Sequence, residues 1–312
     1  MSRGREGAAR RTGVFVVLLL LGVLYVVGIR TWVDRISPGD DFYTLHEAAA
    51  LFAETGRMYG GTYTNLNNPH SIAMLHGFVG RLSLRTAFLV FSGLMFAVVL
   101  AAVPFLARAR DGPGLDDATV ALLLLAWPVT LMTVLSGQVG PVLLLLLAVA
   151  WWALDRGHDT WAGVALGVAV ATKIFVGLFV PTLLVARRGR AAVVAAGTAV
   201  GAYALGLAVL GSDLYATHFG MLAGVDPPGR VNNGSLAGQL ARWGMEGAYP
   251  VVALVVLLVV LWIAWRGRLD TTFGVTVTGM LLLSPLSWYY YMPLLIIPFL
   301  VALGCPGWPR WL

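Results

Sequence analysis

Residues 161–186 read WAGVALGVAVATKIFVGLFVPTLLVA, an apolar run that contains one charged residue, Lys173. Such a run can form one long tilted transmembrane helix. It can also form two half-crossings that are broken at Lys173, with Pro181 loosening the second half. The choice between these two structures decides on which side of a membrane every later loop lies.

The composition of the whole chain is also that of a membrane protein. Of its 312 residues, 59% are hydrophobic and 12% are charged, against roughly 25% charged in an ordinary soluble domain. A chain this apolar can bury itself only in a bilayer, which excludes a soluble enzyme. The single cysteine, Cys305, excludes an intrachain disulfide, and no Cys/His cluster has the spacing of zinc ligands.

Further apolar runs flank this stretch on both sides, and each helical crossing needs roughly 20 residues. With residues 161–186 counted as two halves, the pattern predicts an all-α, polytopic transmembrane helical bundle of about ten crossings or half-crossings. Residues 1–312 then form a single domain. The other runs lie at about 13–29, 84–107, 117–135, 139–154, 190–211, 249–265, 270–286 and 288–304.

The basic residues indicate the topology, since cytoplasmic loops of membrane proteins are rich in Lys and Arg. The N-terminal segment MSRGREGAARR is expected to stay in the cytoplasm, and the run 13–29 lacks a convincing cleavage site and is expected to remain as an anchor. If 161–186 is two halves, most of the 21 basic residues lie inside. A single crossing would place Arg187–Arg190 opposite Arg156, so the two-half structure is favoured.

This topology places the long polar segments, about 30–83 and 212–248, outside together with Lys173. Polar residues that are not topology signals therefore gather on one membrane face, which predicts a site that opens to the extracytoplasmic side. The basic residues are scattered through short loops and form no single cationic face, which argues against nucleic acid as a partner.

Two adjacent carboxylates, Asp40 and Asp41, follow the first run. Partial burial raises the pKa of a carboxylate towards the range of a general base. The alternative is a helix N-cap for the amphipathic stretch that follows, which has Leu45, Ala49 and Phe52 on one side. The pair could hold a divalent ion weakly, but we expect no required metal.

Lys173 is the only lysine in the chain. A lysine at the centre of a membrane helix costs roughly 2.5–3.5 kcal/mol on insertion scales, and its compact ammonium can neutralise a phosphate. The alternatives are a side chain that snorkels to the interface or one that pairs with a carboxylate.

Several weaker motifs interrupt the apolar runs. Gly137-Gln138 combines a tight turn with an amide that both donates and accepts. Asn233-Gly234-Ser235 matches a glycosylation sequon that is short enough to occur by chance, and Arg242 can bind an anionic head group or lie at the interface. The aromatic residues Trp288 to Tyr291 are also typical of an interfacial belt.

Taken in order, these motifs resemble glycosyltransferase family 87, whose members are transferases of the GT-C superfamily that use polyprenyl-phosphate sugars. The resemblance covers about residues 40–291. It rests on Asp41-Phe42, Ala48-Ala49, Gly56-x-x-Tyr59, Asn65-Leu66-Asn67-Asn68-Pro69-His70, Gly137-Gln138, Ala171-Thr172-Lys173, Asn233-Gly234-Ser235-Leu236 with Arg242, and Ser284-Pro285-Leu286-Ser287-Trp288.

The resemblance implies a GT-C bundle whose first outer loop carries a catalytic aspartate, which Asp41 matches better than Asp40. It implies transfer of a sugar, foremost mannose, from a polyprenyl-phosphate donor to a hydroxyl of a lipid-linked or cell-envelope glycan, with inversion. Lys173, with Arg242 or Arg81, would stabilise the departing phosphate. The implied substrate-binding residues are His46, Tyr59, Asn67, His70, Gln138, Asn233, Ser235, Trp288 and Tyr290. The donor is a substrate, and no cofactor is expected.

The chain departs from the family pattern in two places: Tyr289–Tyr291 stand where mannosyl-transferring members often carry histidines, and Leu45 replaces a tyrosine. A noncatalytic GT-C-like protein that binds a polyprenyl lipid is therefore an alternative. A transporter or lipid flippase is another, because Lys173 lies between broken helices. Richness in Ala, Gly, Val and Arg suggests a GC-rich bacterial genome, and hence a multi-pass protein of the bacterial plasma membrane that contacts its lipids.

Overall fold

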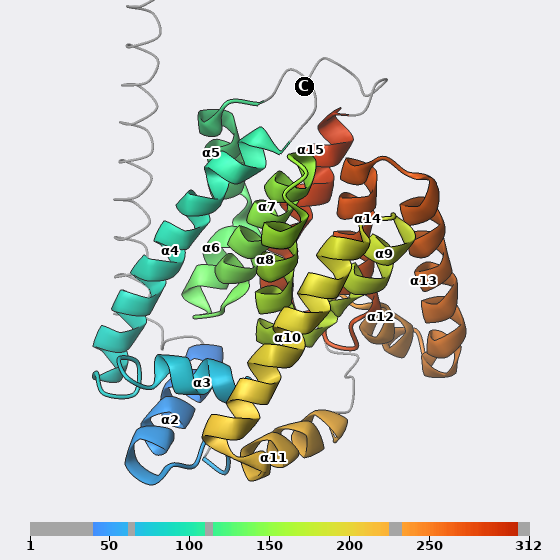
Figure 1. The fold of residues 1–312 in the computed structure, drawn as a ribbon. Helices are drawn as coiled ribbons and strands as arrows, with labels where there is room; N and C mark the ends of the chain where they lie inside the picture. Colours follow the sequence, from blue (N-terminus) through green and yellow to red (C-terminus); the bar gives the residue numbers. More distant parts are fainter. Residues whose placement is uncertain (1–39, 62–65, 110–114, 225–232, 305–312) are drawn as a thin grey trace, which may run out of the picture.

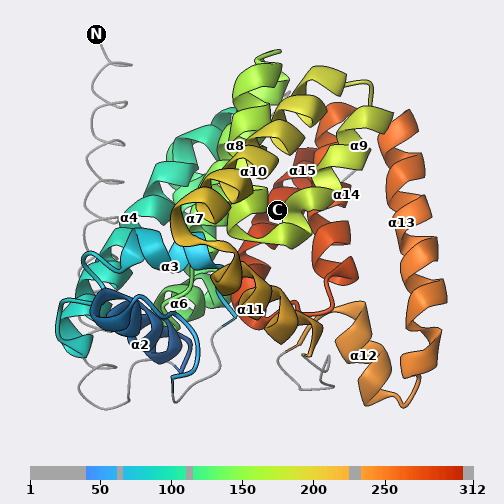
Figure 2. The same ribbon diagram turned by 60° about the horizontal axis from the view of Figure 1, so that its bottom comes forward.

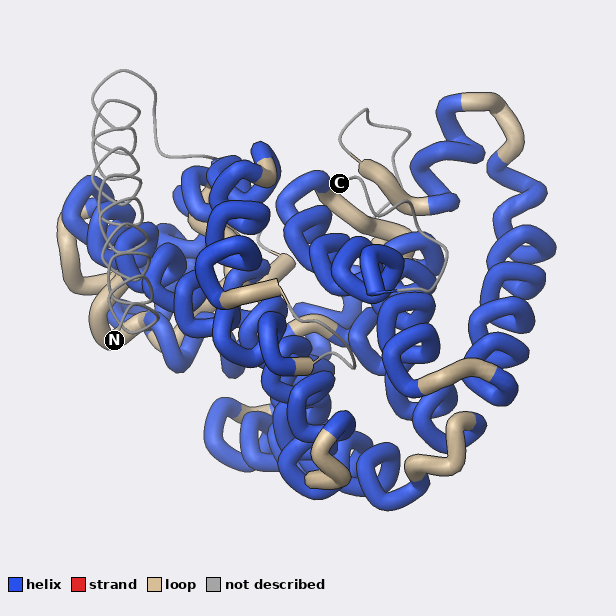
Figure 3. Tube along the Cα trace, turned by 90° about the horizontal axis from the view of Figure 1, so that it is seen from above, coloured by secondary structure: helices blue, strands red, loops and turns tan. Residues whose placement is uncertain are grey.

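The structure is a computed structural model that describes residues 40–61, 66–109, 115–224 and 233–304. Within these ranges the chain is helical and contains no β-strand, apart from one isolated bridge between Asn233 and Trp288 (Figure 3). The predicted all-α fold is confirmed. The run 13–29, the N-terminal arginines and Cys305 lie outside the described residues.

The helices follow the predicted apolar runs closely (Figure 1). In chain order they are α2 (Asp40–Thr55), α3 (Pro69–Leu75), α4 (Leu84–Arg108), α5 (Asp117–Ala126), α6 (Pro128–Leu135), α7 (Gly140–Asp155), α8 (Asp159–Thr172), η1 (Ile174–Leu178), α9 (Phe179–Val185), α10 (Gly189–Leu210), α11 (Ser212–Ala223), α12 (Leu236–Arg242), η2 (Glu246–Ala248), α13 (Tyr249–Arg266), α14 (Leu269–Leu283), η3 (Tyr289–Leu295) and α15 (Ile296–Gly304).

Three helices of the described part are long and apolar enough to span a membrane: α4, α10, and the segment of η2 and α13. A fourth span results if α5 and α6, which bend by 69°, count as one. Pro128 begins α6 and lacks an N–H, and Trp127 before it is extended, so the helix breaks there. The other apolar runs form shorter helices, so the helix lengths do not confirm the expected number of crossings.

The run 161–186 is broken at Lys173, as the charge pattern favoured. Helix α8 ends at Thr172, Lys173 is extended, and η1 and α9 follow. The ion pair of 3.1 Å between Arg188 Nη1 and Asp159 Oδ1 joins the residue before α10 to the first residue of α8. Both ends of the segment therefore lie at the same end of the bundle, and Lys173 lies at its turning point.

Small residues allow α8 to pack closely along α10. A Cβ atom on Gly163 would lie 2.6 Å from the Cβ of Val194, and one on Gly167 would overlap Thr198. Because Gly lacks a Cβ, the two helix backbones approach more closely than larger residues would permit. This contact holds the short helix α8 against a long membrane helix.

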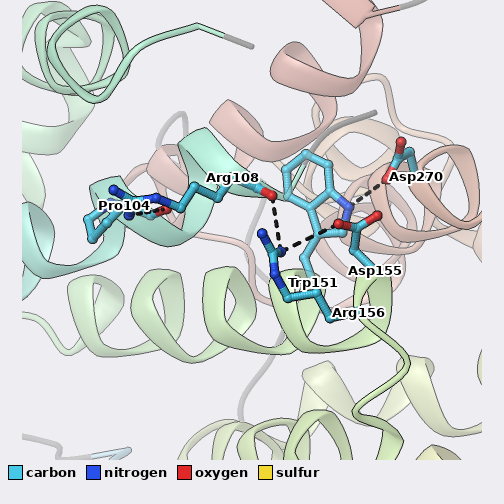
Figure 4. A network of polar contacts seen from close by, with 6 residues as sticks. All are labelled: Pro104, Arg108, Trp151, Asp155, Arg156 and Asp270. Carbon is cyan, nitrogen blue, oxygen red and sulfur yellow. Dashed lines mark hydrogen bonds and ion pairs between the residues drawn. The ribbon is translucent and has the colours of Figure 1, made fainter. Parts of the chain in front are cut away.

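A polar network joins the helices at one end of the bundle (Figure 4). The buried Trp151 of α7 donates from Nε1 to Asp270 Oδ1 of α14 at 2.8 Å. Arg156 donates from Nη1 to the Arg108 carbonyl at 3.2 Å and thereby joins α7 to α4. Several predicted cytoplasmic arginines lie at this end.

The two predicted outer segments contain helices and gather at the opposite end of the bundle. In the first segment α2 and α3 are described, and α11 and α12 belong to the second. Figure 1 shows α2, α3 and α11 at the lower end of the bundle, and Figure 2 turns this end forward. On α2, Leu45 and Ala49 are buried, as the amphipathic pattern predicted.

Candidate active site

A cavity of about 830 Å³ opens at the end of the bundle that carries α2, α3 and α11. Its walls come from segments far apart in the chain, including the break at Lys173 and the end of α14. Six of the predicted site residues line it: Asp41, Asn67, Gln138, Lys173, Trp288 and Tyr290.

Asp41 is held at the cavity by the packing of the next residue, Phe42. The Phe42 ring is fully buried and packs edge-on against Phe88 at 5.2 Å between centroids. Gly137 lies so close to it that a Cβ there would meet Phe42. The motifs Asp41-Phe42 and Gly137-Gln138 thus pack together, and both Asp41 and Gln138 line the cavity.

Lys173 is held by the segment that precedes α3. Its Nζ donates to Asn67 Oδ1 at 3.2 Å and lies 5.9 Å from the centre of the Tyr291 ring. Asn68 donates from Nδ2 to the carbonyls of Ala171 and Thr172, at 2.8 and 2.9 Å. The bonds from Asn68 satisfy two carbonyl groups at the C-terminal end of α8. The ammonium of Lys173 lies beside an amide oxygen and an aromatic face.

Tyr59 and His70 bond the two segments that hold Lys173 in place. The Tyr59 hydroxyl donates to the Asn67 carbonyl at 2.8 Å, and burial raises the pKa of that hydroxyl. His70 Nε2 bonds the Ala171 carbonyl at 2.6 Å and its Nδ1 bonds the Tyr215 hydroxyl at 3.0 Å. Burial lowers the pKa of His70, and the bond to Ala171 opposes that shift. Both residues position the site without lining the cavity.

Asn233 joins the second outer segment to the Ser284–Trp288 motif. Its side chain is fully buried, donates from Nδ2 to the Pro285 carbonyl at 3.1 Å, and accepts from the Ser287 N–H at 3.0 Å. Ser235 donates from Oγ to the same carbonyl at 3.1 Å and caps α12. Both side chains are buried and bonded within the protein, and neither lines the cavity. The buried Asn233 cannot serve as a glycosylation acceptor in the folded chain.

The remaining predicted residues lie outside the described lining of the cavity. His46 bonds the Leu82 carbonyl through Nε2 at 2.9 Å, and Arg81 is exposed. Arg242 donates from Nη1 to the Asn233 carbonyl at 3.0 Å, which supports the Asn233 contacts. Asp40 is the first residue of α2.

Tyr289, Tyr290 and Tyr291, at which the sequence departs from the pattern that it resembles, contribute contacts to the site. The Tyr289 hydroxyl lies 2.9 Å from Ser136 Oγ, and the Tyr290 carbonyl accepts from Thr133 Oγ1 at 2.9 Å. Tyr290 and Tyr291 line the cavity. Their contacts join η3 to α6 and to the turn that carries Gln138.

The sequence analysis missed His218 of α11, which is 4% exposed and lines the cavity. Burial, and then the nearby Lys173 charge and His70, lower its pKa to about 4, so the imidazole is neutral at pH 7. The signal that was available is a histidine beside the apolar residues Phe219 to Ala223 of a helix in an outer segment. Thr44 and Tyr203, which were also missed, line the same cavity.

Chemically, the cavity offers a carboxylate, an ammonium, amide groups and an imidazole to one ligand. Another part of the wall is apolar and includes Phe175, Leu178, Phe219, Leu222, Met280 and Leu283. Such a wall suits a ligand with a polar head and a hydrocarbon tail. Within the described ranges, no group of three His, Cys, Asp or Glu side chains is placed to hold a metal ion.

The fold and the site define a membrane protein with a cavity of polar and apolar lining at one end of a helical bundle. The family model for glycosyltransferase family 87 matches residues 65–285, and the chain belongs to this family. It is a membrane glycosyltransferase. No curated protein and no solved structure matches the chain.

Proposed function

We propose that the protein transfers a sugar, with mannose as the first candidate, from a polyprenyl-phosphate donor to a hydroxyl of a lipid-linked or cell-envelope glycan. One observation carries the proposal: Asp41 and Lys173, distant in sequence, line the same cavity. They are a carboxylate that can accept a proton and a cation that can receive a phosphate. A GT-C arrangement supplies these two groups from an outer loop and a membrane segment, as the family resemblance implies.

In the proposed reaction, Asp41 takes the proton of the acceptor hydroxyl as its oxygen attacks the anomeric carbon of the sugar. The new carbon–oxygen bond forms while the bond from that carbon to the donor phosphate breaks. The electron pair leaves with the polyprenyl phosphate. A single displacement of this kind inverts the configuration at the anomeric carbon.

Lys173 has the role of stabilising the departing phosphate. A preorganised cation directed at the oxygen where charge develops lowers the barrier, since it needs no reorganisation during the reaction. We assign this role to Lys173 ahead of Arg242 and Arg81, because Lys173 lines the cavity. Arg242 instead supports Asn233.

The apolar wall has the role of receiving the first isoprene units of the donor. A lipid-linked donor is held in the bilayer by its tail and brings its phosphate and sugar to the membrane surface. The site therefore needs no nucleotide-binding domain. We propose that no metal or cofactor is required, because Lys173 supplies the positive charge that the departing phosphate needs.

We place the protein in the bacterial plasma membrane as a multi-pass chain, with the N-terminus in the cytoplasm and the site outside. The distribution of charge supports this topology: Arg108 and Arg156 lie in the polar network of Figure 4, at the ends of α4 and α7 opposite to the end that carries α2, α3 and α11. The positive-inside rule places such an end in the cytoplasm. Cysteine accessibility in intact cells, with Cys305 replaced and single cysteines at Arg57 and Arg156, tests it: only the first position should react with an impermeant reagent.

The proposal is tested by a transfer assay with the full chain in detergent. Radiolabelled polyprenyl-phosphate-mannose and an envelope lipid extract serve as donor and acceptor, with Asp41→Asn run beside the parent protein. Asp213→Asn is the matched control, because Asp213 is exposed on α11 and its side chain bonds Ser212. Transfer by the parent and Asp213→Asn, with a loss of at least about 100-fold in Asp41→Asn, is the expected result.

Other results would contradict specific parts of the proposal. Equal transfer by Asp41→Asn would contradict the role of Asp41 as general base. Absence of transfer from mannose, arabinose and glucose donors would favour a noncatalytic lipid-binding protein. Movement of an unchanged donor across sealed vesicles, with no new glycan, would favour a lipid flippase.

A further inference from the structure

His218 is a buried polar side chain with a hydrogen-bonding atom that the fold leaves unused. The residue is 4% exposed, and its Nδ1 atom is buried with no hydrogen-bond partner among the described residues. Most buried polar atoms in proteins have a partner, so an exception calls for an explanation. Since His218 lines the cavity, a bound ligand is a natural partner.

The imidazole is held in place by a chain of contacts that ends at Lys173. Its ring stacks on Tyr59, with 6.0 Å between centroids and an interplanar angle of 23°. The Tyr59 hydroxyl bonds the Asn67 carbonyl, and the Asn67 side chain accepts the bond from Lys173 Nζ. The position of His218 relative to the ammonium is therefore set by the protein before a ligand binds.

The chemistry of this pair suits an anionic oxygen. A neutral imidazole carries one N–H donor, and an ammonium carries three, of which the Lys173 group gives one to Asn67. A phosphate carries several charged oxygens and can accept from both groups that line the cavity, whereas the oxygen of a sugar hydroxyl gains little from the positive charge. Hydrogen bonds to ionised groups are also the stronger ones.

We propose that His218 is a phosphate-binding residue: its imidazole donates a hydrogen bond to the phosphate group that Lys173 neutralises. The inference rests on the proposed function and deepens it, because it names a residue of the second outer segment as part of the donor subsite. Helix α11 then contributes to recognition of the donor, and does not merely cover the cavity.

The test measures binding to the full chain in detergent, with no transfer step. The probes are geranylgeranyl phosphate, the uncharged alcohol geranylgeraniol, and inorganic phosphate. His218→Phe keeps the ring that stacks on Tyr59 and removes both nitrogens, while His218→Gln keeps a donor. The matched control is His158→Phe, because His158 lies beside Trp152 at the start of α8, at the other end of the bundle.

His218→Phe should weaken the binding of geranylgeranyl phosphate by about tenfold, which is the value of one hydrogen bond to a charged group. It should leave the binding of geranylgeraniol unchanged. His218→Gln should recover most of the loss, and His158→Phe should bind both lipids like the parent. Inorganic phosphate should compete only at far higher concentration, because it lacks the tail.

Three results would overturn the inference in different ways. Equal binding of geranylgeranyl phosphate by the parent and His218→Phe would remove His218 from the subsite and leave the proposed function intact. An equal loss for the phosphate and the alcohol would contradict a bond from His218 to the phosphate, because such a bond predicts a loss for the phosphate alone. Binding of the alcohol by the parent as tight as that of the phosphate would contradict the phosphate subsite, and with it the proposed donor.

Discussion

Phe42 packs against Gly137 so closely that a Cβ atom on Gly137 would lie 2.5 Å from the Phe42 Cβ. Gly137 also has a φ of +69°, in the left-handed region that favours glycine. Asp41 precedes Phe42, and Gln138 follows Gly137. Both Asp41 and Gln138 line the cavity. One contact between two motifs therefore sets the position of the carboxylate to which we assign the chemistry.

Gly137→Ala should lower the free energy of unfolding by roughly 2–4 kcal/mol, the sum of backbone strain and a clash in a packed region. It should also reduce transfer, because Phe42 must move and Asp41 with it. Gly157→Ala is the control: its φ of +73° is similar, but its Cβ would meet nothing within 4 Å. It should cost only about 1 kcal/mol. Denaturant unfolding and the transfer assay measure both; an equal cost in the two variants would contradict the contact.

Lys173→Met should reduce kcat/KM for transfer by about 100-fold, since the variant lacks the cation for the departing phosphate. Lys173→Arg should fall between the parent and Lys173→Met, because it keeps the charge on a planar group that fits the site of the compact ammonium less well. Arg57→Met, at an exposed position outside the cavity lining, is the control and should retain full activity. Steady-state kinetics with a polyprenyl-phosphate sugar measure these values. Activity of Lys173→Met near that of the parent would remove Lys173 from the site.

Asn233→Ala should lower the free energy of unfolding by roughly 2–4 kcal/mol, because three backbone groups lose a buried partner. These are the N–H groups of Ser287 and Ser235 and the carbonyl of Pro285, although the carbonyl keeps its bond from Ser235 Oγ. Gln239→Ala, at a half-buried position on the short helix α12 that follows Asn233, is the control and should cost less than about 1 kcal/mol. Denaturant unfolding followed by tryptophan fluorescence measures the difference. A cost in Asn233→Ala no larger than in the control would contradict the structural role.

The stability of the parent protein should fall as the pH drops from about 6.5 to about 4. The pKa of His218 is about 4 in the folded chain, against about 6.5 in an unfolded one. The unfolded chain therefore binds the extra proton first, and the contribution of His218, complete above pH 6.5, is lost in this window. The groups near it are Lys173, His70 and Tyr59, and the lowered pKa of His70 acts in the same direction.

His218→Phe isolates the contribution of His218, since His70 remains in both proteins. The fall in melting temperature between pH 7 and pH 4.5 should be smaller in His218→Phe than in the parent. Thermal unfolding in detergent at both pH values measures it. Parallel pH dependence in the two proteins would show that the folded chain does not hold His218 neutral.

Most of the helical fold could be predicted from hydrophobic patterning. The apolar runs match the helices to within a few residues, and the arginine pattern favoured the break at Lys173 that the structure shows. The bend at Trp127-Pro128 was missed, although a proline in an apolar run is a signal for a break. The number of crossings could not be derived, because several runs form helices of fewer than 18 residues and a run's composition does not reveal where its helix stops.

From the pattern of residues alone, the site was predictable only where a residue conflicts with its surroundings; Asn67 and Tyr290, which also line the cavity, were named through the family resemblance. Lys173 in an apolar run and the carboxylates at a membrane edge stood out, and Lys173 and Asp41 line the cavity. Asn233 and Ser235 also stood out as polar motifs, but their side chains satisfy backbone groups of a distant turn, which no local pattern reveals. His218 was overlooked because its surroundings are assembled from α11, Tyr59 and the break at Lys173, which meet only in the folded chain.

The ion pair of Arg188 with Asp159 fixes the start of helix α8, and the turn at Lys173 fixes its end, so the length of α8 sets the distance between them. The 14 residues of α8 span roughly 21 Å at the usual rise per residue. This length sets the distance of Lys173 from the ion pair of Arg188 with Asp159. One inserted residue would move Lys173 by about 1.5 Å and turn it by about 100° around the helix axis. The length of α8 is thus constrained independently of its composition, and relatives that keep this lysine should vary the residues of α8 far more readily than their number.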